Sequence, residues 1–414
     1  MPDPAAQTPV LPLVNSKPSS ESSNIETIFN RLQSGRIIIP DYQRDAGQWD
    51  LRKESLFIES ILNNLTIPAF FFADGPDGKI EVVDGQQRLT TIFKYVKNEF
   101  ALSTDDDVVY LSPQSLQYRG KPFGELPLSL KAVFNDYPLT IINLPSNLDL
   151  STKLEIFRRI NEGGTPLTGQ DIRLSYYSDS RSVFFLKLSG IHSDTDSAKR
   201  MIQAGEEKGL ENPWSTHADA NVLWQEWWEG KEVAKGQTPS EMFLWYLVML
   251  HHDKLGEMLQ DQSQIRHLKL AFRGTTEEAL DIYCAQLRYT ETEGGVEIFP
   301  IYGSGLIEEF YEFADWMKLL LGVKLPSANV QKYKQMALLI GALTRLNINA
   351  AKISDAAWNV ISLFLKSARA VGEEFLKDVG GYPEQKGRWG GEKGQLGQCR
   401  AVELLLKRLV EKYP

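Results

Sequence analysis

Apolar residues follow two different patterns along this chain, and the change between them falls near residue 180. Before it, short β-branched runs alternate with segments in which apolar residues recur every three or four positions, as in a domain that mixes strands and helices. From about residue 213 onward the period is helical almost throughout. We therefore predict an α/β domain at residues 23–180 followed by a mainly α-helical domain at residues 181–414. The strands are expected at residues 36–39, 69–73, 79–83 and 137–144.

The first 22 residues are rich in proline, serine and glutamine and contain few periodic apolar positions. Such a composition is typical of a disordered leader, so we expect residues 1–22 to lie outside the fold. A helix follows at residues 25–32, with Ser22 or Ser23 placed to cap its first turn. Further helices are expected at residues 51–64, from Gln86 onward, at residues 151–160 and after residue 165, whereas residues 101–136 show only a weak pattern.

The second domain combines regular helices with one exceptional segment. Residues 380–397 contain seven glycines together with Lys386, Arg388 and Trp389. This segment is either a linker or an adaptable loop that offers cations and aromatic rings to a ligand, and we expect it to be mobile in the free protein. The tryptophans of the helices are more typical of a core than of a base-stacking surface. The helices are expected at residues 222–228, 242–252, 277–287, 306–321, 330–346, 355–370 and 401–412, and they carry Trp224, Trp227, Trp228 and Trp245.

The candidate chemistry begins where the third predicted strand ends, at Asp84 and Gly85. The helical period starts directly afterwards, so Gln86, Gln87 and Arg88 occupy the first helical turn. Unpaired backbone N–H groups and the positive end of the helix dipole favour an anion at such a turn. Arg88 adds donors that match phosphate, and Asp84 can hold a metal, orient Arg88 or cap the turn.

A structural interpretation explains the same five residues. Asp84 and Gly85 then make a tight turn, and the next three residues are a solvated helix start. Both interpretations stay open on this stretch alone, because short motifs often match by chance.

Polar residues also gather at a second strand end. Tyr42, Gln43 and Arg44 follow the strand predicted at residues 36–39. Ligand sites collect at the carboxyl ends of strands, so we expect these side chains to share one pocket with the Asp84 corner.

Arg158, Arg159 and Asn161 lie near the end of the helix predicted at residues 151–160 and are free to point at a neighbouring site. The alternative is that the two arginines simply complement the helix dipole.

Charge and apolar content limit the partners. The net charge is −9, with 17 basic and 23 acidic residues in 1–180 and 28 and 31 in the remainder. Neither part has the concentrated positive surface that sequence-independent DNA binding needs, so any DNA contact should be local. The longest apolar run, residues 242–250, is too short to span a bilayer, and the N-terminus lacks a basic segment followed by an apolar one.

Cysteine use agrees with a reducing compartment. Cys284 and Cys399 form neither a metal-ligand spacing nor a disulfide framework. We therefore expect a cytoplasmic protein without a membrane partner, and the sequence leaves assembly into a homo-oligomer open.

Several motifs of the first part occur in a characteristic order and spacing. They are Ile39-Pro40-Asp41-Tyr42-Gln43-Arg44, Trp49, Ile67-Pro68, Val83-Asp84-Gly85-Gln86-Gln87-Arg88-Leu89-Thr90-Thr91 and Arg159-Ile160-Asn161-Glu162-Gly163-Gly164. Together they resemble the DGQQR-motif family, the N-terminal domain of GmrSD-type, modification-dependent restriction systems, which is related to the ParB and sulfiredoxin fold. The resemblance spans roughly residues 25–180, and the combination is far more specific than any single motif.

The resemblance implies a small ParB/sulfiredoxin-like domain that binds and hydrolyses a nucleoside triphosphate with Mg²⁺. It leaves open whether the nucleotide is ATP, GTP or CTP. It also implies a bacterial defence against modified phage DNA. On this resemblance the catalytic residues are Asp84, Gln87 and Arg88, the metal ligand is Asp84, and the nucleotide-binding residues are Gly85, Gln86, Gln87, Arg88, Tyr42, Gln43, Arg44 and Asn161.

One departure from the family concerns the nuclease. Many relatives carry a C-terminal HNH nuclease domain, which needs a catalytic histidine beside further metal ligands. The final third of this chain has no histidine, so a conventional HNH site is absent there. Two functions stay open: a nucleotide-dependent sensor or switch, and a non-catalytic DNA-binding or scaffold subunit that works with a separate nuclease.

Overall fold

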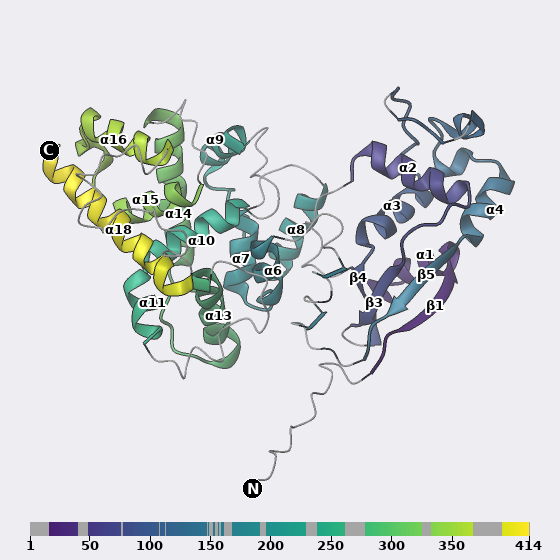
Figure 1. Cartoon of the computed structure of the whole chain (residues 1–414), viewed down its shortest axis with the longest axis horizontal. Coiled ribbons are helices and arrows are strands. Elements are labelled where there is room, and N and C mark those ends of the chain that lie inside the picture. The colour runs from purple at the N-terminus through teal and green to yellow at the C-terminus, as the bar shows by residue number, and fades with distance from the viewer. Residues whose placement is uncertain are drawn as a thin grey trace, which may run out of the picture. The chain divides into compact units, whose positions relative to one another are not determined.

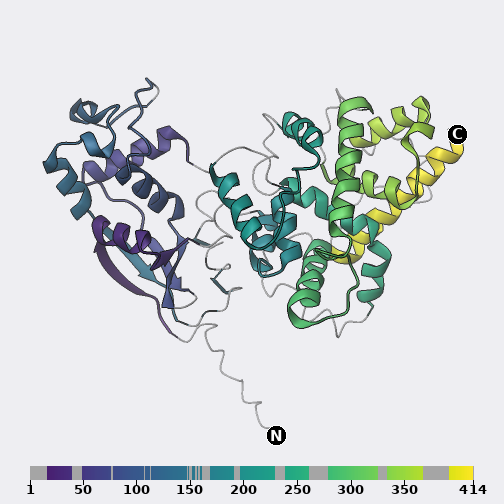
Figure 2. The ribbon, with the colours of Figure 1, turned by 180° about the vertical axis from the view of Figure 1, so that it is seen from behind.

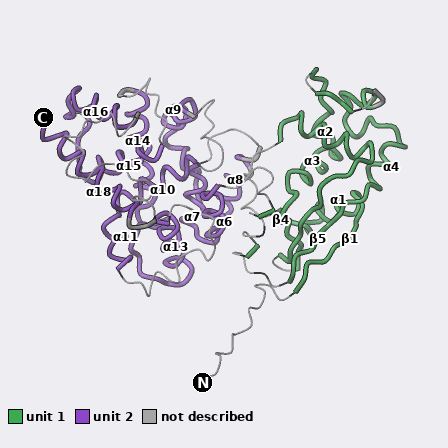
Figure 3. The backbone as a smooth tube through the Cα atoms, viewed as in Figure 1, with its two compact units in different colours: residues 1–165 green, residues 166–414 purple. Residues whose placement is uncertain are grey.

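The structure of the chain is a computed structural model in two compact units, residues 1–165 and residues 166–414 (Figure 3). Unit 1 is mixed α/β and unit 2 is helical, which confirms the predicted fold class. No helix within the described ranges is long and apolar enough to cross a membrane. The structure describes residues 16–39, 49–75, 78–106, 108–111, 113–146, 168–190, 196–228, 238–260, 278–324, 333–366 and 391–413, together with residues 148, 152, 153, 156, 159 and 160.

A mixed five-stranded sheet forms the frame of unit 1, in the order β1-β5-β3-β4-β2 (Figure 1). β3 (Phe70–Asp74) and β4 (Ile80–Asp84) pair antiparallel, at the positions where two strands were predicted. β2 (Ile37–Ile38) runs parallel to β4, with Ile38 opposite Glu81. The carboxyl ends of β2 and β4 therefore point the same way, and β4 delivers Asp84 to that side of the sheet.

The outer strand β1 (Ser19–Asn24) corrects the predicted leader, because residues 19–22 belong to the fold. β1 pairs antiparallel with β5 (Pro138–Asn143) along its whole length. Its side chains are mostly exposed, so a serine-rich sequence without apolar alternation can still form a strand through backbone hydrogen bonds. The predicted helix cap is also wrong, since the Asn24 side chain accepts the hydrogen bond from the Thr27 backbone N–H at 3.0 Å.

Four helices form one core with alternate positions of the strands. Phe70, Phe72, Val82, Leu139 and Ile141 are buried there, as the two-residue period of a strand requires. The helix in the weakly patterned stretch 101–136 was not predicted, because its nine residues bury Phe134 alone and produce little apolar period. The helices are α1 (Ile25–Gln33), α2 (Leu51–Leu62), α3 (Gln86–Val96) and α4 (Leu128–Asp136).

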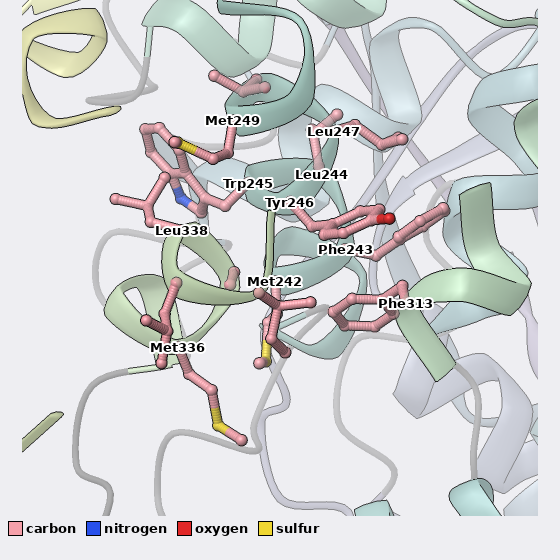
Figure 4. Close-up of a cluster of buried hydrophobic side chains, with 14 of the residues drawn as sticks. Met242, Phe243, Leu244, Trp245, Tyr246, Leu247, Met249, Phe313, Met336 and Leu338 are labelled. Atoms are coloured by element: carbon pink, nitrogen blue, oxygen red, sulfur yellow. The ribbon is translucent and has the colours of Figure 1, made fainter. Parts of the chain in front are cut away.

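In unit 2 the helices surround α10 (Thr238–Leu250) (Figures 1 and 2). Each residue from Met242 to Met249 is fully buried, and Figure 4 shows the side chains of residues 242–247 and of Met249 packed with Phe313, Met336 and Leu338. A helix that is apolar on all sides is expected at the centre of a bundle rather than on its surface. The core assignment of Trp224 and Trp245 is confirmed, since both are fully buried.

The other helices of unit 2 include three that the sequence pattern did not predict, namely α7, α8 and α11. The helices are α6 (Gly169–Tyr176), α7 (Arg181–Ser189), α8 (Asp196–Glu207), α9 (Ala218–Trp228), α11 (His252–Met258), α13 (Glu278–Glu293), α14 (Leu306–Leu319), α15 (Tyr333–Arg345), α16 (Asp355–Lys366) and α18 (Gly391–Lys412).

α18 corrects the predicted loop at residues 380–397. Residues 391–397 are helical and Leu396 is buried. The Gln395 side chain is also buried and accepts a hydrogen bond from the Ala279 backbone N–H at 2.8 Å. Tertiary packing therefore overrides the poor helix propensity of three glycines. The predicted roles of Lys386, Arg388 and Trp389 lie outside the described residues.

Candidate functional site

The corner between β4 and α3 depends on Gly85. This residue is the N-cap of α3 and has a φ of +99°, in the left-handed region that favours glycine. A β-carbon at this position would lie 2.4 Å from Cδ1 of Phe70, whose ring is fully buried. Backbone conformation and close packing thus both require glycine directly after Asp84. The helix then begins at Gln86, as predicted.

The first turn of α3 has no side-chain cap, because its N-cap is glycine. In general, the first backbone N–H groups of a helix have no acceptor one turn earlier in the helix. Together with the helix dipole they favour an anion at this end. The side chains of Gln86 and Gln87 are half-buried at the same turn and carry amide donors. This geometry can bind a phosphate group.

Arg88 faces the protein rather than the end of the helix. One terminal nitrogen donates to Asp84 Oδ2 at 2.7 Å, and the other donates to the carbonyl oxygens of Pro68 and, at 3.0 Å, Ala69. The guanidinium carbon lies 4.6 Å from the centroid of the Phe70 ring, and the residue is 9% exposed. Burial lowers the pKa of Arg88, and the Asp84 carboxylate opposes that shift. The guanidinium therefore clamps the end of β4 to the chain that enters β3.

Three roles were open for Asp84 from the sequence, and the geometry shows one of them: its carboxylate orients Arg88. Its predicted role as a Mg²⁺ ligand stays a prediction. Within the described ranges, no group of three His, Cys, Asp or Glu side chains is placed to hold a metal. The described residues at this corner thus do not hold a metal by themselves, although Mg²⁺ commonly binds one carboxylate together with substrate phosphates.

Gln87 connects the corner to the segment that carries Tyr42, Gln43 and Arg44. Its Oε1 lies 3.4 Å from the backbone nitrogen of Trp49, a long hydrogen bond. Residues 40–48 lie outside the described residues, but their two flanks do not. The chain enters this segment from β2, beside β4, and leaves it at Trp49, beside the first turn of α3.

Lys153 anchors a further segment of the chain to the sheet of unit 1. Its ammonium donates to Glu81 Oε2 at 2.8 Å and to the carbonyl oxygen of Asp74, so it bridges β3 and β4. The Lys153 and Glu81 side chains are 12% and 8% exposed. This pair could not be predicted from the sequence, because 72 positions separate its members. Asn161 lies eight residues after Lys153, outside the described residues.

Residues 68–70 were not recognised as part of the corner. Pro68 and Ala69 supply the carbonyl oxygens that hold Arg88, and the Phe70 ring lies under both Arg88 and Gly85. The motif Ile67-Pro68 was the available signal for this role. It occurs in a fixed order with the DGQQR motif, which indicates that the two motifs are structural partners.

We expect the substitution Arg88→Ala to destabilise unit 1 by about 3 kcal/mol, because it leaves the Asp84 carboxylate poorly solvated and without its cation. Urea unfolding of the full chain, followed by hydrogen exchange at β3 and β4, measures the effect. In the double variant Arg88→Ala/Asp84→Ala part of the loss should return. Equal stability of Arg88→Ala and wild type would contradict the structural role.

Comparison with known proteins supports the assignment of the first unit. Residues 25–178 match the family model for the N-terminal domain of the GmrSD restriction endonuclease. The resemblance expected from the motifs is thereby confirmed over the segment that includes β2 to β5, the β4–α3 corner and α6. No curated protein and no solved structure matches the chain.

Proposed function

We propose that this chain, whose residues 25–178 form a domain of the GmrSD N-terminal type, is a nucleotide-dependent sensor or switch of a bacterial restriction system. The proposed trigger is modified phage DNA, and the proposed effector is a separate nuclease subunit. The single observation that carries nucleotide binding is the uncapped first turn of α3 after the Asp84-Gly85 corner. Backbone N–H groups at such a turn bind phosphate without any further basic residue.

The corner residues take different parts in this proposal. Gln86 and Gln87 bind the phosphates with their amides, and Gln87 orients the attacking water. Asp84 would hold Mg²⁺ together with phosphate oxygens, and the metal would supply charge neutralisation. Arg88 keeps its place under Asp84 and contributes positive potential to the phosphates from there, so it acts chiefly as a positioning residue.

Two segments close the proposed pocket. Tyr42, Gln43 and Arg44 stand between two flanks that both lie beside β4 or α3. The second segment is tied to β4 by the bond from Lys153 to Glu81, and Asn161 follows eight residues later in the sequence.

A phosphate-release assay with ATP, GTP and CTP, each with and without modified DNA, tests the proposal. Release of phosphate that depends on the first turn of α3 supports a hydrolysing switch. Tight nucleotide binding without release identifies a sensor that does not hydrolyse. Failure to bind any of the three nucleotides contradicts the proposal.

The substitution Gln86→Glu separates ligand binding from folding. It places a negative charge at the proposed phosphate position, so we expect at least tenfold weaker nucleotide binding. A carboxylate at a helix N-terminus stabilises the helix by roughly 0.3–1 kcal/mol, so unfolding should not become easier. The matched control is Gln33→Glu, the same charge change at the exposed end of α1. Calorimetric titration and urea unfolding of both variants measure the two effects; equal affinities of both variants would contradict a phosphate site at α3.

A non-catalytic DNA-binding or scaffold subunit is the second candidate function. The internal hydrogen bonds of Arg88 favour it, because a guanidinium held by Asp84, Pro68 and Ala69 is not presented to a phosphoryl group. The acidic balance of the chain weighs against DNA binding by this chain alone. Under this alternative the chain should bind its nuclease partner equally well with and without nucleotide.

A further inference from the structure

Unit 2 contains a polar cluster that the proposed nucleotide site does not use. Among the side-chain polar atoms that are buried without a hydrogen-bond partner in the described part of the chain, four belong to residues that lie beside one another or beside Glu309 of α14. They come from α10, from the residue that precedes α11, and from α13 and α15. The four atoms are the Tyr246 hydroxyl, the His251 Nε2, the Tyr283 hydroxyl and the Thr344 hydroxyl.

Several pairwise interactions link these side chains to one another and to Glu309. The His251 Nε2 lies 3.7 Å from Glu309 Oε1, and the imidazole lies over the Tyr283 ring with centroids 6.2 Å apart. Burial raises the pKa of Tyr246 and of Tyr283, and the Glu309 carboxylate is the next cause in both cases. The Tyr246 hydroxyl also lies near Thr344 and Glu309, but it forms a well-aligned hydrogen bond with neither.

Glu309 lacks a strong cationic partner within this cluster. No lysine or arginine of the described ranges forms a salt bridge with it. Its neighbour His251 is uncharged near neutral pH, because burial first, and then Lys254 and Arg345, lower the pKa of that imidazole to about 4. Burial and then the nearby Glu312 raise the pKa of Glu309, while Tyr246 and the more distant charge of Lys254 oppose that rise. A partly buried carboxylate in this position is stabilised by any cation that enters.

We propose that Glu309, with Tyr246, Tyr283, His251 and Thr344, binds the primary ammonium group of a small amine. An ammonium has three N–H donors and no acceptor, and it needs several acceptors close together. The carboxylate, the hydroxyl oxygens and a neutral imidazole nitrogen can supply them. An anion is disfavoured by Glu309, and a divalent metal is disfavoured because the described residues include no group of three metal-binding side chains.

The cluster is accessible as well as buried. Tyr246 and Tyr283 are fully buried, whereas the Glu309 side chain is 24% exposed. A ligand can therefore reach the carboxylate from solvent, and the two phenols lie deeper in the protein. A buried polar atom that is left without a partner destabilises the protein. An occupant that supplies hydrogen bonds to several of them should bind by removing that cost.

Calorimetric titration of the full chain with methylammonium chloride tests this site. Tetramethylammonium chloride is the matched probe, because it has the same charge but no N–H donor. We expect saturable binding of methylammonium alone. The substitution Glu309→Gln should weaken that binding at least tenfold, since it removes a charge-assisted hydrogen bond. The control Glu308→Gln makes the same charge change at the adjacent, exposed position of α14 and should leave the affinity nearly unchanged.

A second variant distinguishes the amine from trapped water. Tyr283→Phe removes a hydroxyl that has no partner among the described residues, so the free protein should be as stable as the wild type while methylammonium binds several-fold more weakly. Loss of stability in this variant, together with no saturable binding of methylammonium to the wild type, identifies a site for internal water and overturns the proposal. Equal affinity of Glu309→Gln and wild type overturns it as well.

Discussion

Gly85→Ala is expected to destabilise unit 1 by roughly 3–5 kcal/mol, more than any other single change at the corner. Two costs combine. The backbone at +99° strains any residue with a β-carbon, and that carbon would lie 2.4 Å from the Phe70 ring. Phe70 cannot yield easily, because it is fully buried and lies under the guanidinium of Arg88. Urea unfolding with hydrogen exchange at β3, β4 and α3 measures the loss.

Gly35→Ala is the matched control for this experiment. Gly35 follows α1 with a φ of +70°, and a β-carbon there would meet nothing within 4 Å. Only the backbone cost applies, so we expect a loss of about 1–2 kcal/mol. Equal losses at the two positions would show that the contact with Phe70 relaxes on substitution. In that case the corner would be less rigid than the structure indicates.

The start of α3 could be predicted from the sequence, but the use of Arg88 could not. The apolar period and the Asp-Gly pair locate the turn, because both are local signals. The partners of Arg88 are carbonyl oxygens about 20 positions earlier, in the chain entering a neighbouring strand. Nothing in the spacing of the motif reveals which side of the helix faces that strand. A fork of donors suited to phosphate is equally suited to a carboxylate and two carbonyl groups.

The errors in the predicted fold have the same origin: local signals were read correctly from the sequence, whereas tertiary contacts were not visible in it. β1 has no apolar alternation, because it is an edge strand with mostly exposed serines. The start of α18 contains three glycines and was expected to be a loop, but Gln395 and Leu396 are buried there. By contrast, α10 was predicted correctly, since a continuous apolar run of its length fits a central helix of unit 2.

A buried ion pair, Arg173–Asp281, is the basis of the second large prediction. Arg173 Nε donates to Asp281 Oδ1 at 2.7 Å, and the two side chains are 1% and 7% exposed. The pair joins α6 to α13 within unit 2, although α6 belongs to the segment that matches the GmrSD-type domain. The Gln170 side chain accepts from Arg173 and donates to Ser240 at 3.1 Å, so the guanidinium is part of a buried polar network.

Asp281→Asn should destabilise unit 2 by about 3–5 kcal/mol, because it leaves a guanidinium charge buried without its carboxylate. The double variant Arg173→Met/Asp281→Leu should recover most of this loss, since it removes both charges and replaces them with apolar side chains of similar size. The matched control is Asp179→Asn, which breaks the bond to Arg288 on the same helix α13. That pair is 51% and 34% exposed, so its loss should cost at most about 1 kcal/mol.

Urea unfolding of the four proteins measures these differences, and hydrogen exchange assigns them to a unit. We expect Asp281→Asn to expose amides of α6 and α13 while those of β3 and β4 stay protected, because both members of the pair belong to unit 2. Early exchange in β3 and β4 as well would show that the end of the GmrSD-type segment transmits instability from unit 2 into the sheet. The nucleotide affinity of the same variant then becomes informative: a change without any loss of structure at the β4–α3 corner would mean that α6 couples the helical unit to the proposed phosphate site.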